Sequence, residues 1–544
     1  MKKLIVAGII LILSVFSVII CFATSDINEE TTQSALVLQD IDSDVITELP
    51  VKEITANTIY KDCLESASDM KLYEFTISSR CGLSIEFTHK TDDTDTATGW
   101  GLYLFEKYSK TGDGKNYGYR LVNKYSADIS ELTTTTSFSG VYPGEFVFVV
   151  TAGSTFTATE YMFKLTADYT NLYEAEPNNE KAYYTEILTD STYKGISNST
   201  QQVDNDWYLF TLKENGGIDI EFEYGRGSLS QVLWFVTLEN EAGECFYRSR
   251  IYGNDTSASS GEIGLPSGNY LICVETYTQN DIQYSLTVKT ADVSEVEFND
   301  TLETAEELEF TESVAVKSGS ISERRGSYDI DYYTFETEND GVFVLSFGHH
   351  TYARTDTGWE ITVTDEDGHI IFYDVSYWNE GSKVAPLMGV NAGKYYIKID
   401  ADGMRYCNAT YTLKLGVVET DLWETENNDT TDTADKISLD TPISGTLVNN
   451  KLDYDTDYYC IDITEKTYAY LNFSHSNLGT QDEGWIITIT NEDGKELDSF
   501  TSKWVDTKRL SKLLTLNPGR YYISVDTGLH FNNKKYTLKL ESIE

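Results

Sequence analysis

The chain has 544 residues and a formal net charge of −47 at neutral pH. It is too long for a single hydrophobic core and suits roughly three to five domains. The large excess of carboxylates over Lys and Arg argues against nucleic acid as a partner and against binding to an anionic membrane, because both surfaces are negatively charged.

The N-terminal residues predict a secretory signal peptide over residues 1–23. Lys3 is the last charge before an apolar run over residues 4–23, which ends in a small-residue cleavage site. Cys21 raises the alternative of a lipid-modified N-terminus, although Ile20 stands where a small residue is preferred. We therefore expect a secreted protein that is extracellular or loosely associated with the cell surface.

Residues 24–50 are rich in Thr, Ser, Asp and Glu, so we expect a flexible leader before the first domain. No later stretch is long and apolar enough for a membrane span. The sequence predicts no membrane-spanning segment and a monomeric chain.

Four domains are predicted from a turn that recurs before an apolar or aromatic strand. Its glycines are 124, 125 and 126 residues apart, at Gly144, Gly268, Gly393 and Gly519. Repeats of this length are whole domains rather than solenoid units. The predicted domains are residues 51–170, 171–291, 292–420 and 421–544.

Period-two alternation of apolar residues dominates each repeat, as in Phe343, Leu345 and Phe347. This pattern is typical of strands with one buried and one wet face. Helical periodicity is confined to short segments near 301–308 and 430–437. The sequence therefore predicts an all-β chain of four tandem β-sandwiches.

Six cysteines follow the predicted signal peptide. Cys63 with Cys81, and Cys245 with Cys273, fall within one repeat and could form disulfides in an oxidising compartment. Cys407 and Cys460 have no local partner. No C-x-x-C motif occurs, so a zinc or redox site is not expected.

Packets of oxygen ligands open the second, third and fourth repeats. Each has an E-x-E-x-N-[DN] motif followed, about thirty residues later, by D-x-D. Alternate residues of an extended segment share a face, and carboxylate and amide oxygens are the ligands that calcium prefers. Acids at a domain edge can also be a solvated strand, but three copies at similar spacing favour calcium sites. The candidate ligands are Glu174, Glu176, Asn178, Asn179, Asp204 and Asp206; Glu295, Glu297, Asn299, Asp300, Asp329 and Asp331; and Glu424, Glu426, Asn428, Asp429, Asp455 and Asp457.

These packets, the G-x-[IL] strand at Gly319 and Gly445, and the final P-G-x-Y-Y-I and Y-x-L strands together resemble the bacterial pre-peptidase C-terminal domain. That family includes the collagen-binding domains of clostridial collagenases. The resemblance is clear over residues 292–544, weaker over 171–291 and weakest over 51–170. It implies jelly-roll-like sandwiches in which the two packets bind calcium.

Departures from the family pattern predict a gradient of calcium affinity. Asn179 replaces an Asp, so the second repeat should bind more weakly than the third and fourth. In the first repeat Asp69 and Lys71 occupy the D-x-D position, and the ammonium group would repel calcium. No peptidase motif precedes the repeats, so proteolysis is not expected.

Two sets of aromatic and histidine residues recur. His89, His349 and His475 each precede a Gly-Trp pair, and they lack companions at metal-ligand spacing, so we interpret them as structural. A second aromatic position is either a core anchor or an exposed ring that stacks on a polymer. The residues assigned to it are Tyr125, Tyr252, Trp378 and Trp504.

No nucleophile and base constellation is recognisable, so the sequence predicts no enzyme. We expect a secreted calcium-binding protein that binds an extracellular protein fibre or polysaccharide through repeated weak sites. The alternatives are a passive spacer or folding aid, and a hydrolase of unfamiliar type within residues 51–170.

Overall fold

The computed structural model describes residues 49–91, 97–110, 117–169, 172–197, 204–225, 230–278, 282–325, 328–401, 409–448, 455–529 and 531–543. The predicted signal peptide, nearly all of the leader and Cys407 lie outside these residues. Within them, no helix is long and apolar enough to cross a membrane.

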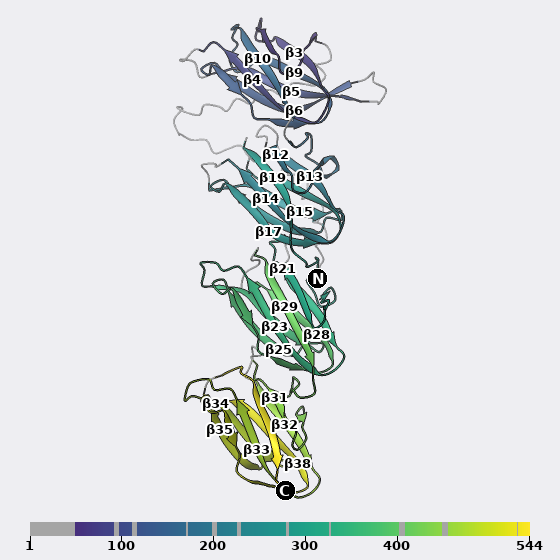
Figure 1. The fold of residues 1–544 in the computed structure, drawn as a ribbon. Helices are drawn as coiled ribbons and strands as arrows, with labels where there is room; N and C mark the ends of the chain where they lie inside the picture. Colours follow the sequence, from purple (N-terminus) through teal and green to yellow (C-terminus); the bar gives the residue numbers. More distant parts are fainter. Residues whose placement is uncertain are drawn as a thin grey trace, which may run out of the picture. The chain divides into compact units, whose positions relative to one another are not determined.

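Eight β-sheets form four sandwiches that follow one another along the sequence, coloured from purple to yellow in Figure 1. The all-β prediction is confirmed. The described residues contain one 3-10 turn, η1 (Lys181–Tyr183), and otherwise only strands, turns and loops.

In the first sandwich one sheet has the order β1-β3-β9-β5-β6, and the other has the order β2-β10-β4-β7 with β8 beside β4. The strands are β1 (Val51–Glu53), β2 (Ile59–Asp62), β3 (Met70–Ile77), β4 (Cys81–His89), β5 (Thr98–Ser109), β6 (Tyr117–Asp128), β7 (Thr133–Thr135), β8 (Ser139–Val141), β9 (Gly144–Ala152) and β10 (Tyr161–Asp168).

The second sandwich pairs the sheets β11-β13-β18-β15-β16 and β12-β19-β14-β17. The strands are β11 (Thr185–Glu186), β12 (Thr192–Ile196), β13 (Asn205–Leu212), β14 (Gly216–Tyr224), β15 (Val232–Asn240), β16 (Cys245–Tyr252), β17 (Ser257–Leu265), β18 (Gly268–Thr276) and β19 (Gln283–Ala291).

The third sandwich pairs β20-β22-β28-β24-β25 with β21-β29-β23-β26, and β27 lies beside β23. The strands are β20 (Glu306–Glu307), β21 (Val314–Gly319), β22 (Asp331–Thr337), β23 (Gly341–His349), β24 (Thr357–Asp365), β25 (Ile370–Tyr377), β26 (Ser382–Val384), β27 (Met388–Val390), β28 (Gly393–Asp400) and β29 (Tyr411–Glu419).

The fourth sandwich repeats this order as β30-β32-β38-β34-β35 and β31-β39-β33-β36, with β37 beside β33. The strands are β30 (Asp435–Lys436), β31 (Ile443–Gly445), β32 (Thr456–Ile463), β33 (Thr467–His475), β34 (Glu483–Asn491), β35 (Glu496–Lys503), β36 (Lys508–Leu510), β37 (Leu514–Leu516), β38 (Gly519–Thr527) and β39 (Tyr536–Ser542).

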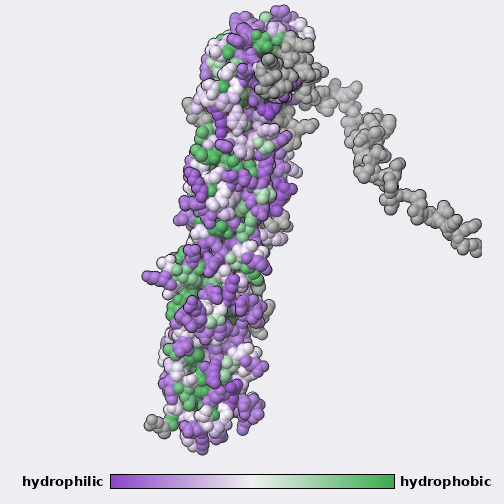
Figure 2. All heavy atoms as spheres, turned by 90° about the vertical axis from the view of Figure 1, so that its right-hand side faces the viewer, coloured by the Kyte–Doolittle hydropathy of each residue, from purple (hydrophilic) through white to green (hydrophobic). Residues whose placement is uncertain are grey.

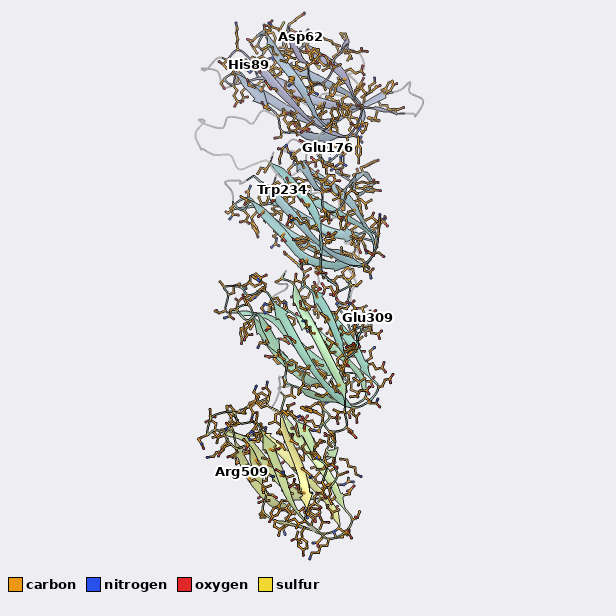
Figure 3. The ribbon with its side chains drawn as sticks, viewed as in Figure 1. Asp62, His89, Glu176, Trp234, Glu309 and Arg509 are labelled. Atoms are coloured by element: carbon orange, nitrogen blue, oxygen red, sulfur yellow. The ribbon has the colours of Figure 1, made fainter. Side chains whose placement is uncertain are left out.

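A fully buried tryptophan marks the core of each sandwich, at Trp100, Trp234, Trp359 and Trp485. His89, His349 and His475 lie against three of these rings, with centroids 4.1, 4.0 and 4.2 Å apart. The structural interpretation of these histidines is confirmed. In the second sandwich Tyr224 packs on Trp234, which is labelled in Figure 3. The Gly-Trp pattern missed Trp234 because Leu233, not glycine, precedes it.

One expectation needs correction, and one open question about the cysteines is answered. The segments near 301–308 and 430–437 are not helical: each is a turn followed by a two-residue strand. In each turn a pair of threonine hydroxyls, Thr301 with Thr304 and Thr430 with Thr433, bonds locally and competes with a helix. Cys63, Cys81, Cys245 and Cys273 are free thiols in the structure, so neither of the two disulfides that the sequence left open is formed.

Candidate metal centres

The short parallel strand pair of each sandwich brings the two halves of each acid packet together. In the fourth sandwich β30 pairs with Tyr459 and Cys460 of β32, and the Tyr458 N–H donates to the Asn428 carbonyl at 3.0 Å. The same backbone bond joins Tyr332 to Asn299 in the third sandwich and Trp207 to Asn178 in the second. The predicted ligands therefore converge in each of these three repeats.

We call each group of converged side chains a cage. Most members are buried, and three are half-buried: Asn179, Asp300 and Asp429. The fully buried members are Glu174, Glu176, Asn178, Asp204 and Asp206 in the second cage, Glu295, Glu297, Asn299, Asp329 and Asp331 in the third, and Glu424, Glu426, Asn428, Asp455 and Asp457 in the fourth.

The fourth cage has unsatisfied oxygens that face inward. Oxygen atoms of Glu424, Glu426 and Asp457 lie within 4.8 Å of one another. One buried oxygen on each of four side chains has no hydrogen-bond partner: Glu426 Oε1, Asn428 Oδ1, Asp455 Oδ1 and Asp457 Oδ1. Buried polar groups without partners are rare, and here a cation is the partner that all four would share.

Repulsion among these buried carboxylates also favours a cation. Burial, with added repulsion from Asp455 and Glu424, raises the pKa of Asp457 well above its usual range. Burial raises the pKa of Glu424 to about 7, a smaller effect because the Tyr459 hydroxyl and the Thr446 N–H stabilise its charge. A divalent ion would reverse this by stabilising the charged forms.

Neighbouring groups hold the outer oxygens of the fourth cage in place. The Tyr459 hydroxyl donates to Glu424 Oε2 at 2.6 Å, and Tyr536 donates to both Glu424 and Asp457. The two tyrosine hydroxyls are 2.6 Å apart. A Cβ atom at Gly445 would collide with Glu424 Oε2, so this position requires glycine.

The tyrosine pair is a feature that the sequence reasoning did not single out. It recurs in all four sandwiches, as Tyr73 with Tyr161, Tyr208 with Tyr284, Tyr333 with Tyr411 and Tyr459 with Tyr536. The first member follows the D-x-D position and the second begins the last strand, so the repeat alignment contained the signal.

The second cage is similar with one charge fewer. Oxygens of Glu174, Glu176 and Asp206 lie within 4.8 Å of one another, and Glu176 lies at the end of the sandwich where the chain enters it (Figure 3). The Asn178 amide faces Asp206 Oδ1 and Glu176 Oε2 at 3.2 Å from each. Its oxygen would suit a shared cation, whereas its NH₂ group would suit hydrogen bonds without one.

The third cage is arranged differently, because an arginine side chain enters it. The carboxylates that converge are Glu297, Asp300 and Asp329. Arg324 makes ion pairs with all three, and its side chain is 1% exposed. Sequence reasoning missed this residue because it lies in the loop between the two ligand packets and belongs to neither.

The first repeat has no acidic cage among the residues that the structure describes. Lys71 Nζ lies 3.0 Å from Asp69 Oδ2, as its place in the D-x-D position suggested. Tyr73 donates instead to Asp62 at 3.0 Å.

A metal ion therefore fits the second and fourth cages, where buried oxygens converge without an internal cation. It does not fit the third cage in the arrangement seen here, since a guanidinium group already lies among the three converging carboxylates and pairs with each of them.

The four aromatic residues assigned to a second repeated position are not equivalent. The strand register places Tyr252 level with Tyr377, one residue before Trp378. Tyr125 pairs with Leu102, further along its strand. The first hairpin, in which Thr98 pairs with Asp128, is longer than the others, so sequence spacing misplaced Tyr125. Tyr252 was aligned one residue away from the position that corresponds to Trp378.

Burial separates these aromatic residues further. Trp378 is 3% exposed and packs on Trp359, so it is a core anchor, whereas Tyr252 is 38% exposed. Tyr125 and Trp504 are partly buried and pack against the cores of their sandwiches.

Comparison with known proteins places these features in context. No protein-family profile matches the chain. Over 257 residues, or 46% of its length, the chain is 25% identical to collagenase ColA of Clostridium perfringens. It spans only 22% of the length of that collagenase.

Among solved structures, the pre-peptidase C-terminal domain of a collagenase from Bacillus anthracis matches over 95% of its own length and 22% of this chain, at 16% identity and a TM-score of 0.16. A triple jelly-roll protein of an archaeal virus matches over 80% of its length and 63% of this chain, at 12% identity and a TM-score of 0.20. The predicted resemblance to the pre-peptidase C-terminal domains of collagenases is confirmed, as a distant relationship.

Proposed function

We propose that this chain is a non-catalytic extracellular protein whose calcium-stabilised sandwiches bind an extracellular polymer, either a protein fibre or a polysaccharide. The observation that carries the calcium part is the set of four buried, unpartnered oxygens in the fourth cage. Two of these side chains, Glu426 and Asn428, precede the sandwich. Of the other two, Asp455 immediately precedes β32 and Asp457 is its second residue.

A cation in this cage would tie the leading segment of the repeat to its own sandwich. Binding to the folded state alone stabilises that state by mass action, by about 2.7 kcal/mol when calcium is at 100 times its Kd. The same reasoning applies to the second cage, where one carboxylate fewer predicts weaker binding. The predicted signal peptide supports an extracellular location, as does the similarity to a collagenase.

Polymer binding is supported by the tandem arrangement and by exposed aromatic rings. Linked modules on a repeating ligand gain avidity without any single strong site. Tyr252 and Tyr377 occupy equivalent strand positions and are 38% and 40% exposed, so their rings are available for stacking. The face shown in Figure 2 is largely hydrophilic with small scattered apolar patches, which suits weak contacts better than one large apolar interface.

Calorimetric titration of the chelator-treated chain with calcium chloride tests the calcium part. We expect heat of binding that Asp457→Ala and Asp206→Ala each reduce by one site, because each removes a charge and a ligand. Asp462→Ala, which changes an exposed carboxylate elsewhere on β32, is the matched control and should leave binding unchanged. If the chain binds no calcium, this part of the proposal is wrong.

Retention on insoluble collagen, cellulose, xylan and mucin, with calcium and with chelator, tests the polymer part. We expect retention on one matrix that Tyr252→Ala and Tyr377→Ala weaken without changing the melting temperature. Equally poor retention on every matrix would favour a passive spacer. Hydrolysis of any of these matrices or of casein would instead show that the chain is an enzyme.

A further inference from the structure

The side chain of Arg324 lies where the third cage would hold a metal ion. Its Nη2 atom is 2.5 Å from Glu297 Oε1 and 2.7 Å from Asp329 Oδ1. Its Nη1 atom is 2.9 and 2.7 Å from the two carboxylate oxygens of Asp300. One guanidinium group thus contacts all three carboxylates that converge in this repeat.

The guanidinium group is enclosed as well as paired. The side chain of Arg324 is 1% exposed, and those of Glu297 and Asp329 are fully buried. The Phe298 ring covers it, with its centroid 4.8 Å from the guanidinium carbon. Burial opposes the charge of Arg324, but the three ion pairs outweigh burial and raise its pKa. The residue is therefore charged at any physiological pH.

The loop that delivers Arg324 has the same length in the fourth repeat. Asp329 lies ten positions after Gly319, and Asp455 lies ten positions after Gly445, so Arg324 corresponds to Asn450 in the sequence. An asparagine at this position brings no charge. Of the two repeats with a complete E-x-E-x-N-D motif, only the third carries a basic residue there.

We propose that Arg324 is a built-in cation that replaces calcium in the third repeat. The inference rests on the proposed function, since it divides the cages into two that bind calcium and one that does not. The third sandwich is then held to its leading segment by ion pairs at any calcium concentration. The second and fourth sandwiches are held only when calcium is present.

Electrostatic repulsion should prevent a calcium ion and the Arg324 guanidinium group from occupying the third cage together. A calcium ion bound to Glu297 or Asp329 would lie next to the guanidinium group, and the buried setting screens their repulsion poorly. Displacing Arg324 would require moving a buried charge with three partners into water.

The remaining cage side chains suggest what removal of the arginine would do. Asp331 Oδ1 and the Asn299 amide have no hydrogen-bond partner among the described residues. Ligands for calcium therefore remain in place, and only the arginine prevents their use.

The test is the number of calcium ions bound by the full chain, measured by calorimetry and by equilibrium dialysis with radioactive calcium. We expect two sites in the wild type and three in Arg324→Asn. Arg325→Asn is the matched control, because Arg325 is exposed and adjacent, and it should keep two sites. Asp331→Ala in the wild type should also leave two sites.

Loss of the buried charge will destabilise Arg324→Asn in chelator, so unfolding is followed alongside binding. We expect calcium to raise the melting temperature of the third sandwich in Arg324→Asn and to leave it unchanged in Arg324→Lys. Limited proteolysis at the segment around residue 297 gives the same comparison if the melting transitions overlap.

Three sites in the wild type, one of them lost in Asp331→Ala, would overturn the inference and leave the proposed function standing. Two sites in Arg324→Asn would also overturn it, because the cage would then be unable to bind calcium even without the arginine. If the wild type binds none, the proposed function fails, and the inference fails with it unless Arg324→Asn binds one.

Discussion

Asn428 donates a side-chain N–H to Asp435 Oδ2 at 3.2 Å, and its amide oxygen, which accepts no hydrogen bond, is left for the fourth cage. Asp435 is itself fixed by Thr425, whose backbone N–H and hydroxyl donate to its two oxygens at 2.8 and 2.7 Å. Asp435 thus holds a ligand in the orientation that a cation needs, without being a ligand itself.

Asp435→Ala should weaken calcium binding in the fourth cage while leaving every ligand present. Loss of such a supporting contact typically reduces metal affinity by about 10- to 100-fold. Calorimetry on the full chain would show one site with a higher Kd and an unchanged number of sites. Asp432→Ala changes an exposed acid in the same turn and should have no effect. Equal affinities in the two variants would contradict this role.

Gly445→Ala should disturb the fourth cage by displacing the Glu424 carboxylate. The added methyl group would overlap Glu424 Oε2 and the Tyr536 hydroxyl, so the carboxylate has to move. We expect a loss of about 1–3 kcal/mol in unfolding free energy and weaker calcium binding. Denaturant titration and calorimetry measure the two effects. Gly393→Ala, where the added carbon meets nothing within 4 Å, is the control and should be nearly neutral.

The sequence predicted the fold because its signals are local and repeated. Alternation at Phe343, Leu345 and Phe347 reports a strand that is buried on one face, and the recurring glycines set the domain length. The convergence of the cage residues was also predictable, since their spacing depends on the extended backbone. Arg324 was not, because its role depends on where a loop folds back, and no local pattern encodes that contact.

The spacing of residues in the sequence also could not predict which of two adjacent aromatic side chains is buried. Trp378 and Tyr377 are neighbours, yet one ring packs on Trp359 and the other is 40% exposed. Alternate residues of a strand point to opposite faces, so an error of one residue in register exchanges a core anchor for a surface ring.

Trp378→Ala should therefore mainly lower the stability of the third sandwich. Removing a buried tryptophan costs about 3–5 kcal/mol through lost contacts and the cavity left behind. Chemical denaturation of the chain, followed by Trp fluorescence, should show an earlier transition for the third sandwich. Tyr377→Ala is the adjacent control, and its effect should be within about 0.5 kcal/mol. An unchanged transition in Trp378→Ala would return this residue to the candidate ligand surface.

Acid sensitivity of the fourth sandwich should depend on His475. Its Nε2 atom lies 2.9 Å from the Ser502 hydroxyl, its Nδ1 atom lies 2.7 Å from the Ser476 carbonyl, and its ring lies against Trp485. Burial lowers the pKa of His475, and this outweighs the opposing effects of the Ser476 carbonyl and of Asp506. The fold therefore favours the neutral ring.

The direction of the pH effect on stability follows from comparing proton uptake by the folded and the unfolded chain. The unfolded chain takes up a proton near pH 6.5, before the folded chain does, so His475 costs stability as the pH falls from about 6.5 to its lower folded pKa. Denaturation at saturating calcium between pH 7.5 and 5.5 should show this loss, and His475→Gln should reduce the slope. His369, in the third sandwich, is the control of opposite sign: Asp365 raises its pKa, so His369→Gln should make the loss of stability of the third sandwich in acid slightly steeper and leave the fourth sandwich unchanged. An identical pH slope in the wild type and His475→Gln would show that this histidine is not the acid-sensitive group.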